Sequence, residues 1–227
     1  MNNEEAAKIK VQVGGMASSG SSLLYNIVRM LLEKEQLTNN TQWILVKEHK
    51  RLPDQDFYIV TMRDLRDTTA SWMLRRKMPK KKVWGETIAA LKKNMKWVNE
   101  FFYLNGTSFD AKKIHLWKYE EYKANPSAEI QKIVAFLNLQ HIDSPTIEEV
   151  IKIAENLINI SPPHADREKL SAAERSFLDK TKLTKEHAST NAGRIGKYHQ
   201  FFNNTETNQI LELSKDFLIK YEYLENK

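Results

Sequence analysis

Short apolar runs alternate with longer amphipathic stretches along the chain. Four runs are apolar and bounded by polar or glycine-containing turns, which is typical of buried strands: residues 9–13, 43–46, 57–62 and 113–118. Between them, apolar residues recur at helical spacing, as at Leu24, Ile27, Val28 and Leu31. Strands that alternate with helices predict βαβ units. We therefore expect an α/β fold of three layers, with a short central parallel β-sheet flanked by helices.

The same periodicity predicts further helices after the third strand. One of them has a long apolar stripe that we interpret as core: Trp84, Ile88, Leu91, Met95, Val98 and Phe102. Proline marks the start of two more, after Asn125 and after Ser144, and the last helix begins before Ile210. Residues 161–187 are polar and charged, and we expect a mobile segment there.

A glycine- and serine-rich turn joins the first strand to the first helix. Such a turn can direct several backbone N–H groups to one anion, and the helix N-terminus adds its positive dipole end. The spacing of Gly15, Gly20 and Ser22 is that of a phosphate-binding Walker A loop, but Ser21 stands where that motif has lysine. Three readings stay open: a loop for another kind of phosphate, a handicapped kinase or nucleoside triphosphatase, and a turn that binds nothing.

Candidate ligand groups also follow two of the other strands. Lys47 and His49 come after the second strand, and Arg63 comes after the third. Because ligands of parallel α/β sheets bind beyond the carboxyl ends of the strands, these side chains and the glycine-rich turn are expected to share one crevice.

Composition narrows the class of protein. With 227 residues and no cysteine, the chain can bury one core and cannot use disulfides or thiolate chemistry, so we expect a single domain over residues 1–227. No stretch approaches the ~20 apolar residues of a membrane span, and the polar start predicts no signal peptide, which favours a cytoplasmic protein.

The net charge of +6 suits an anionic ligand. The basic residues 75–82 lack the features of a nucleic-acid-binding face, so nucleic acid is not an expected partner.

Taken together, these motifs resemble those of the P-loop sulfotransferases, which transfer a sulfuryl group from 3′-phosphoadenylyl sulfate (PAPS) to a hydroxyl or amine. The resemblance implies a P-loop-type fold, PAPS as co-substrate and 3′-phosphoadenosine 5′-phosphate (PAP) as product. No metal is implied, because no carboxylate pair follows the loop. The loop is similar to the family's 5′-phosphosulfate loop, in which the Walker lysine is not needed. The residues assigned to it are Ser18, Ser19, Gly20, Ser21 and Ser22.

Two further motifs match around the next strands. Residues 63–71 read R-D-L-R-D-T-T-A-S and are similar to R-D-P-R-D-x-x-x-S, which implies that Arg63 and Ser71 bind the 3′-phosphate. Residues 47–49 look like the K-T-H of cytosolic members. By this resemblance His49 is the general base for the acceptor, Lys47 stabilises charge on the bridging oxygen, and Glu48 remains an alternative base.

The remaining motifs lie in the second half of the chain. Residues 119–137 are similar to Y-E-D-L-x-x-N-P…I-x-x-F-L, which implies that Tyr119 contacts the adenine. Residues 191–198 read N-A-G-R-I-G-K-Y and resemble R-K-G-x-x-G-D-W, which implies that Gly193 and Arg194 close over the nucleotide.

Three positions depart from the family's pattern. Ser18 replaces a lysine or arginine that would neutralise the leaving phosphate, Leu23 replaces an aromatic residue, and residues 191–192 replace a basic pair. A degenerate PAPS- or PAP-binding protein without transfer activity therefore stays open as an alternative. The acceptor, a small molecule or a glycan, is not readable because variable loops form acceptor pockets. Residues 75–84 and 161–190 are expected to be mobile lid segments, and the oligomeric state is left open.

Overall fold

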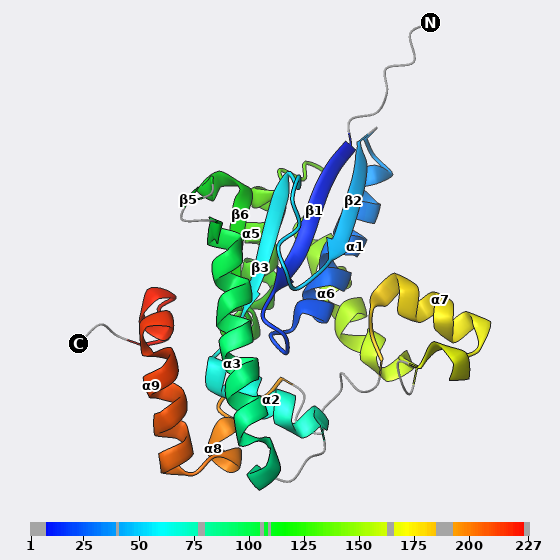
Figure 1. The fold of residues 1–227 in the computed structure, drawn as a ribbon. Coiled ribbons are helices and arrows are strands. Elements are labelled where there is room, and N and C mark those ends of the chain that lie inside the picture. The colour runs from blue at the N-terminus through cyan, green and yellow to red at the C-terminus, as the bar shows by residue number, and fades with distance from the viewer. Residues whose placement is uncertain are drawn as a thin grey trace, which may run out of the picture.

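A four-stranded parallel sheet forms the centre of the computed structural model, with strand order β2-β1-β3-β6 (Figure 1). The strands span Lys8–Gly15 (β1), Gln42–Lys47 (β2), Phe57–Met62 (β3) and Ile114–Lys118 (β6), and a small antiparallel pair joins Tyr103–Leu104 (β4) to Thr107–Ser108 (β5). The structure describes residues 8–39, 41–76, 80–104, 107–108, 110–162, 166–184 and 193–224.

Helices cover both faces of this sheet, which gives three layers (Figure 1). One face carries α1 (Ser21–Gln36), α5 (Pro126–Phe136) and α6 (Ser144–Asn156). The other face carries α2 (Leu65–Arg76), α3 (Lys80–Phe102) and α9 (Asn204–Lys220). The short helices are α4 (Tyr119–Ala124), α7 (Ala172–Thr181) and α8 (Tyr198–Phe201). The α/β architecture predicted from the sequence is thereby confirmed.

Alternation along the strands divides the core into two apolar clusters. On β3, Ile59 faces the cluster under α1, α5 and α6, while Tyr58 and Val60 face the cluster under α2, α3 and α9. The stripe predicted on the long helix is core, as expected, with Leu91 and Val98 fully buried in the second cluster. Because both faces of the sheet are covered, the carboxyl ends of the strands remain the edge at which a ligand can enter.

Local capping explains two of the helix starts. The side chain of Asn125 accepts a hydrogen bond from the backbone N–H of Ala128 at 3.2 Å, and Pro126 occupies the first turn of α5. The side chain of Asp143 accepts from the N–H of Thr146 at 2.9 Å and caps α6 in the same way.

The two expected lid segments contain helical residues that were not predicted from the sequence. Residues 75–84 hold the end of α2 and the start of α3, with residues 77–79 outside the described part. Within 161–190, α7 begins with a capping box between Ser171 and Glu174. The carbonyl of Thr181 accepts a hydrogen bond from Asn26 of α1 at 2.8 Å, which attaches the end of α7 to the body of the protein. Residues 163–165 and 185–190 lie outside the described residues.

A partly buried histidine on β6 couples the stability of this fold to pH. The ring of His115 lies 5.3 Å from that of Phe136 on α5. Burial lowers the pKa of His115 to about 4, and the charge of Lys132 acts in the same direction. The folded protein therefore holds this imidazole in its neutral form.

We expect the free energy of unfolding to fall by about 2 kcal/mol between pH 7 and pH 5 through this one group. The unfolded chain takes up a proton near pH 6.5, whereas the folded protein resists it until about pH 4, so stability rises with pH across this window. Urea unfolding of the wild type and His115→Leu at both pH values measures the effect. The variant should lack this part of the pH dependence, and an equal loss in both proteins would contradict the assignment.

Candidate active site

The glycine-rich turn between β1 and α1 is shaped by two close backbone contacts. Gly15 has a φ of +103°, and a Cβ there would lie 2.5 Å from the carbonyl oxygen of Thr61 on the neighbouring strand. Gly20, the N-cap of α1, has a φ of +88°, and a Cβ there would lie 2.7 Å from the ring of Tyr119. Only glycine fits both the backbone conformation and the space at these two positions.

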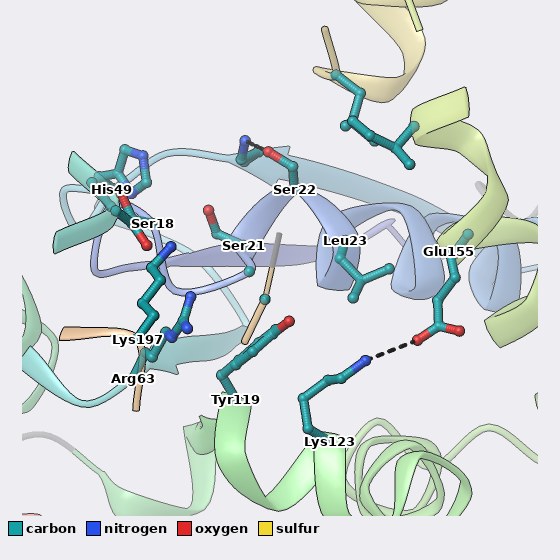
Figure 2. A pocket seen from close by; sticks show the side chains of 18 residues that line it. Ser18, Ser21, Ser22, Leu23, His49, Arg63, Tyr119, Lys123, Glu155 and Lys197 are labelled. Carbon is teal, nitrogen blue, oxygen red and sulfur yellow. Dashed lines mark hydrogen bonds and ion pairs between the residues drawn. The ribbon is translucent and has the colours of Figure 1, made fainter. Parts of the chain in front are cut away.

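The N-terminus of α1 opens towards the pocket that this turn borders (Figure 2). The first N–H groups of a helix have no intrahelical acceptor, and the first turn of α1 carries no acidic side chain that would compete for them. Ser21 and Ser22 add hydroxyl groups at the pocket wall. Backbone donors, hydroxyls and the helix dipole together make this end of the pocket suited to an oxyanion.

Three hydrogen bonds hold the turn in place on the side away from the pocket. The backbone N–H of Ala17 donates to the side chain of Asn94 on α3 at 2.9 Å. The hydroxyl of Ser19 lies 2.7 Å from both the carbonyl oxygen of Met16 and the hydroxyl of Thr61, and its side chain is fully buried. The hydroxyl of Ser19, which the resemblance assigns to the anion-binding loop, is therefore bound inside the protein, and Ser19 does not line the pocket.

A buried arginine forms another part of the pocket wall. Arg63 follows β3, is 4% exposed, and lines the same pocket as the turn. One of its terminal nitrogens donates to the carbonyl oxygen of Arg194 at 2.7 Å, and the same nitrogen lies 3.6 Å from Asp67. Its Nε is buried and has no hydrogen-bond partner among the described residues. Ser71, which lies in the middle of α2, also lines the pocket.

The carboxylate of Asp67 fixes the loop that leads into α8. It accepts hydrogen bonds from the backbone N–H of Gly196 at 2.7 Å and of Tyr198 at 3.1 Å. Arg66 pairs with Asp64 and lies over the ring of Tyr198 at 4.5 Å. Arg66 and Asp67, two residues of the R-D-L-R-D motif that are assigned no ligand, together hold the start of α2 to the α8 loop.

Tyr119 contacts three parts of the site: Arg63, the turn at Gly20 and the loop at Gly193. The guanidinium of Arg63 lies 4.7 Å from the centre of its ring, which is a cation–π contact. Gly20 packs against one edge of the ring, and a Cβ on Gly193 would collide with its hydroxyl. Burial raises the pKa of Tyr119, so the phenol stays neutral at physiological pH. A rigid neutral ring between two glycine loops is suited to contact a flat ligand group.

The two predicted catalytic side chains depend on a buried glutamine. The amide nitrogen of Gln12 on β1 donates to the carbonyl oxygens of Glu48 and Lys50 at 2.9 and 2.6 Å, and its oxygen accepts from Leu52 at 2.9 Å. These three bonds anchor the loop after β2. Lys47, at the end of β2, then reaches the hydroxyl of Ser22 at 2.5 Å.

His49 has a defined orientation in this loop. Its Nδ1 lies 3.1 Å from the carbonyl oxygen of Gly15, and because that oxygen only accepts, Nδ1 carries the proton and Nε2 the lone pair. The ring stacks on Trp97 of α3, with centroids 5.1 Å apart and planes 9° from parallel. By contrast Glu48 is exposed, accepts from the N–H of His49 at 2.9 Å, and does not line the pocket. The geometry favours His49 over Glu48 as a base.

Nearly all predicted site residues meet in one pocket of about 360 Å³. Its lining includes Ser18, Gly20, Ser21, Ser22, Lys47, His49, Arg63, Ser71, Tyr119 and Gly193. Arg194 does not line it: its side chain is exposed, and its backbone carbonyl binds Arg63 instead. That Arg194 closes over the nucleotide stays a prediction. Residues 191 and 192, where the family has a basic pair, lie outside the described part of the chain.

Sequence reasoning missed three charged residues of this pocket. Lys123 of α4 and Glu155 of α6 lie 3.7 Å apart at the end lined by Leu23, and they are distant in sequence, so no local signal marks them (Figure 2). Lys197 also lines the pocket and is 2% exposed. Its signal was present in the G-x-x-G-K-Y pattern, where the lysine stands in place of the family's acidic residue.

Comparison with known proteins gives the family. Residues 57–221 match the sulfotransferase domain model, which is most of the chain. The protein belongs to the sulfotransferase family. The matched range contains Arg63, Ser71, Tyr119 and Gly193, whereas the turn before α1 and the loop of His49 precede it. No curated protein sequence matches the chain.

Solved structures show the sulfotransferase fold at low identity. A retinol dehydratase with androsterone and inactive cofactor PAP has a TM-score of 0.61 at 13% identity, over 92% of this chain and 80% of its own. Mouse sulfotransferase SULT7A1 with PAP gives 0.58 and 15%, over 93% and 84%. A retinol dehydratase with retinol and PAP gives 0.61 and 14%, over 95% and 83%. In the described part of this sulfotransferase, no helix is both long and apolar enough to cross a membrane.

Proposed function

We propose that this protein transfers a sulfuryl group from PAPS to a hydroxyl or amine of a small molecule, and that residues 1–227 form a single sulfotransferase-like domain. The observation that supports this most is the common pocket of two anion sites. The helix N-terminus at Ser21 and the buried guanidinium of Arg63 line the same cavity, with the ring of Tyr119 between the loops. Such an arrangement suits one adenosine with a charged group at each end.

The residues of this chain fit that nucleotide. Arg63 lines the pocket and has a buried Nε without a partner among the described residues, so a phosphate at this wall would complete its hydrogen bonding. Ser71 and the backbone at Gly193 lie at the same wall. Leu23, in place of an aromatic residue, leaves the ring of Tyr119 as the aromatic contact for adenine.

Positioning and charge stabilisation account for the catalysis that we assign to this chain. When bound, PAPS supplies an activated sulfuryl group. The Nε2 of His49 takes the proton of the acceptor, because Nδ1 is committed to Gly15. The ammonium of Lys47, held at the hydroxyl of Ser22, donates to oxygens that gain charge during transfer.

Two alternatives make different predictions. A nucleotide kinase or triphosphatase would hydrolyse ATP with magnesium, but Ser21 stands in the position of the Walker lysine. A degenerate PAPS- or PAP-binding protein would bind PAP tightly and transfer sulfuryl to no acceptor, and Ser18 is the residue in its favour.

The nature of the acceptor extends this proposal. Two of the structures with the same fold are complexes with androsterone and with retinol, which supports a small molecule over a glycan here. The cytoplasmic location and the lid role of residues 75–84 and 161–190 stay predictions from the sequence.

We expect PAP to raise the melting temperature far more than AMP or ATP at the same concentration. A ligand at 100 times its Kd stabilises by about 2.7 kcal/mol, or roughly 5–10 °C for a domain of this size. A thermal-shift series measures this, and transfer of labelled sulfate from PAPS to a panel of small alcohols tests the chemistry. Equal shifts with AMP and PAP, or magnesium-dependent ATP hydrolysis, would contradict the proposal.

A further inference from the structure

Lys197 places a buried positive charge at the pocket. It precedes α8, is 2% exposed and lines the cavity together with Ser18, His49 and Arg63. The carboxylate of Asp67 binds the backbone N–H groups on both sides of it, at Gly196 and Tyr198, so the main chain that carries this lysine is fixed. Figure 2 shows its side chain running past Arg63, with the ammonium end directed towards Ser18.

The charge of the pocket as a whole is strongly positive. Among the described residues of the lining, four are cationic and one is a carboxylate, with His49 counted as neutral: Lys47, Arg63, Lys123 and Lys197 against Glu155. The carboxylate is paired with Lys123 at 3.7 Å, at the end of the pocket lined by Leu23. The other three cations of the lining, Lys47, Arg63 and Lys197, lie towards the other end, where Arg63 also has the carboxylate of Asp67 at 3.6 Å outside the lining. An anionic ligand that enters here would therefore meet cationic donors, and its charge would add to the interactions that stabilise the buried ammonium group.

The turn itself supplies no cationic side chain at Ser18. This residue's φ of +66° puts it at the left-handed corner of the anion-binding turn, yet its side chain carries no charge. The pattern of the family has lysine or arginine at this position. Lys197 enters from a segment 179 residues later in the chain and brings an ammonium group to the same corner.

We propose that Lys197 binds the phosphosulfate end of PAPS and supplies the positive charge that is missing at Ser18. This rests on the proposed function. During transfer the bond from sulfur to the bridging oxygen breaks, a bond from sulfur to the acceptor oxygen forms, and the acceptor proton passes to His49. The electron pair of the broken bond stays on the phosphate of PAP, where the ammonium of Lys197 stabilises it.

Charge removal and charge relocation test this assignment. In Lys197→Met, we expect kcat for transfer from PAPS to fall by ~10²–10³-fold, the usual effect of removing one group that stabilises the charge of a transition state. Lys197→Arg should stay within about tenfold of the wild type. The double variant S18K/K197M should recover at least about tenfold over K197M, because it returns a cation to the same corner from the other side.

Binding measurements separate this role from its rivals. Loss of Lys197 should weaken AMP and PAP by similar factors, because both carry the 5′-phosphate. A selective loss for PAP would assign Lys197 to the 3′-phosphate and overturn the proposal, as would an unchanged kcat in K197M. Should K197M fail to fold by circular dichroism, Lys197→Gln replaces it in both series. A wild type that neither binds PAP nor transfers sulfuryl would refute the proposed function itself, whereas an active wild type with unaffected Lys197 variants refutes only this inference.

Discussion

Replacing His49 with alanine is expected to lower kcat by ~10²–10⁴-fold while leaving the affinity for PAP nearly unchanged. The reason lies in the tautomer. Nδ1 is bound to the carbonyl oxygen of Gly15 and the ring is stacked on Trp97, so Nε2 presents its lone pair in a fixed direction. Transfer from PAPS to the best acceptor, measured under saturating conditions, gives kcat, and a thermal shift with PAP gives the binding control.

Glu48→Gln is the matched control for this prediction. Glu48 is adjacent in sequence, was the alternative base, and is exposed outside the pocket lining. Its substitution should change kcat by less than a few-fold, since its carboxylate only accepts from the backbone N–H of His49. A large loss in Glu48→Gln together with a small loss in His49→Ala would reverse the assignment of the base.

The second large effect concerns the 3′-phosphate. Arg63→Lys should weaken PAP by roughly 10- to 150-fold and leave AMP much less affected, because hydrogen bonds to charged groups contribute about 1.5–3 kcal/mol and lysine lacks the guanidinium fork. Lysine is preferred to alanine here because it keeps a positive charge beside the buried Asp67. Titration calorimetry with the two nucleotides measures the difference.

Arg66→Lys controls for structural damage in the same motif. Arg66 pairs with Asp64 and lies over Tyr198, but it does not line the pocket. It should lower the free energy of unfolding without changing the ratio of PAP to AMP affinity. Equal losses of PAP and AMP in Arg63→Lys would mean that Arg63 holds the loop and does not bind the 3′-phosphate.

The local elements follow from the chain with little help from tertiary structure. The run 57–62 is β-branched and apolar and forms β3 with these bounds. Asn125 followed by proline starts α5, because a side-chain oxygen caps the first turn and proline needs no N–H there. The helix α7 (Ala172–Thr181) was not predicted. Its polar composition hid a capping box at Ser171 and the bond from Asn26 that attaches the helix end.

For the site too, some residues could be predicted from the sequence and others only from the tertiary structure. Motif spacing was enough to find the groups that flank strand ends, such as Lys47, His49 and Arg63, because parallel strands bring their carboxyl ends to one edge. The inward turn of Ser19 was not readable, since it depends on the position of Thr61 on another strand. The pattern G-x-x-G-K-Y contained Lys197, but it did not show that this side chain enters the pocket while that of Arg194 stays outside, because both positions depend on how Asp67 holds a loop far along the chain.

The sequence by itself determined the order of strands and helices, the glycine-rich turn and the family, because these depend on periodicity and on residues close together in the chain. Only the tertiary structure decided which side chains face the cavity. That choice depends on long-range contacts: the buried amide of Gln12 sets the loop of His49, and the carboxylate of Asp67 sets the loop of Lys197. Local propensity carries no information about such pairings, since each joins segments that meet only when the sheet and its helices have packed.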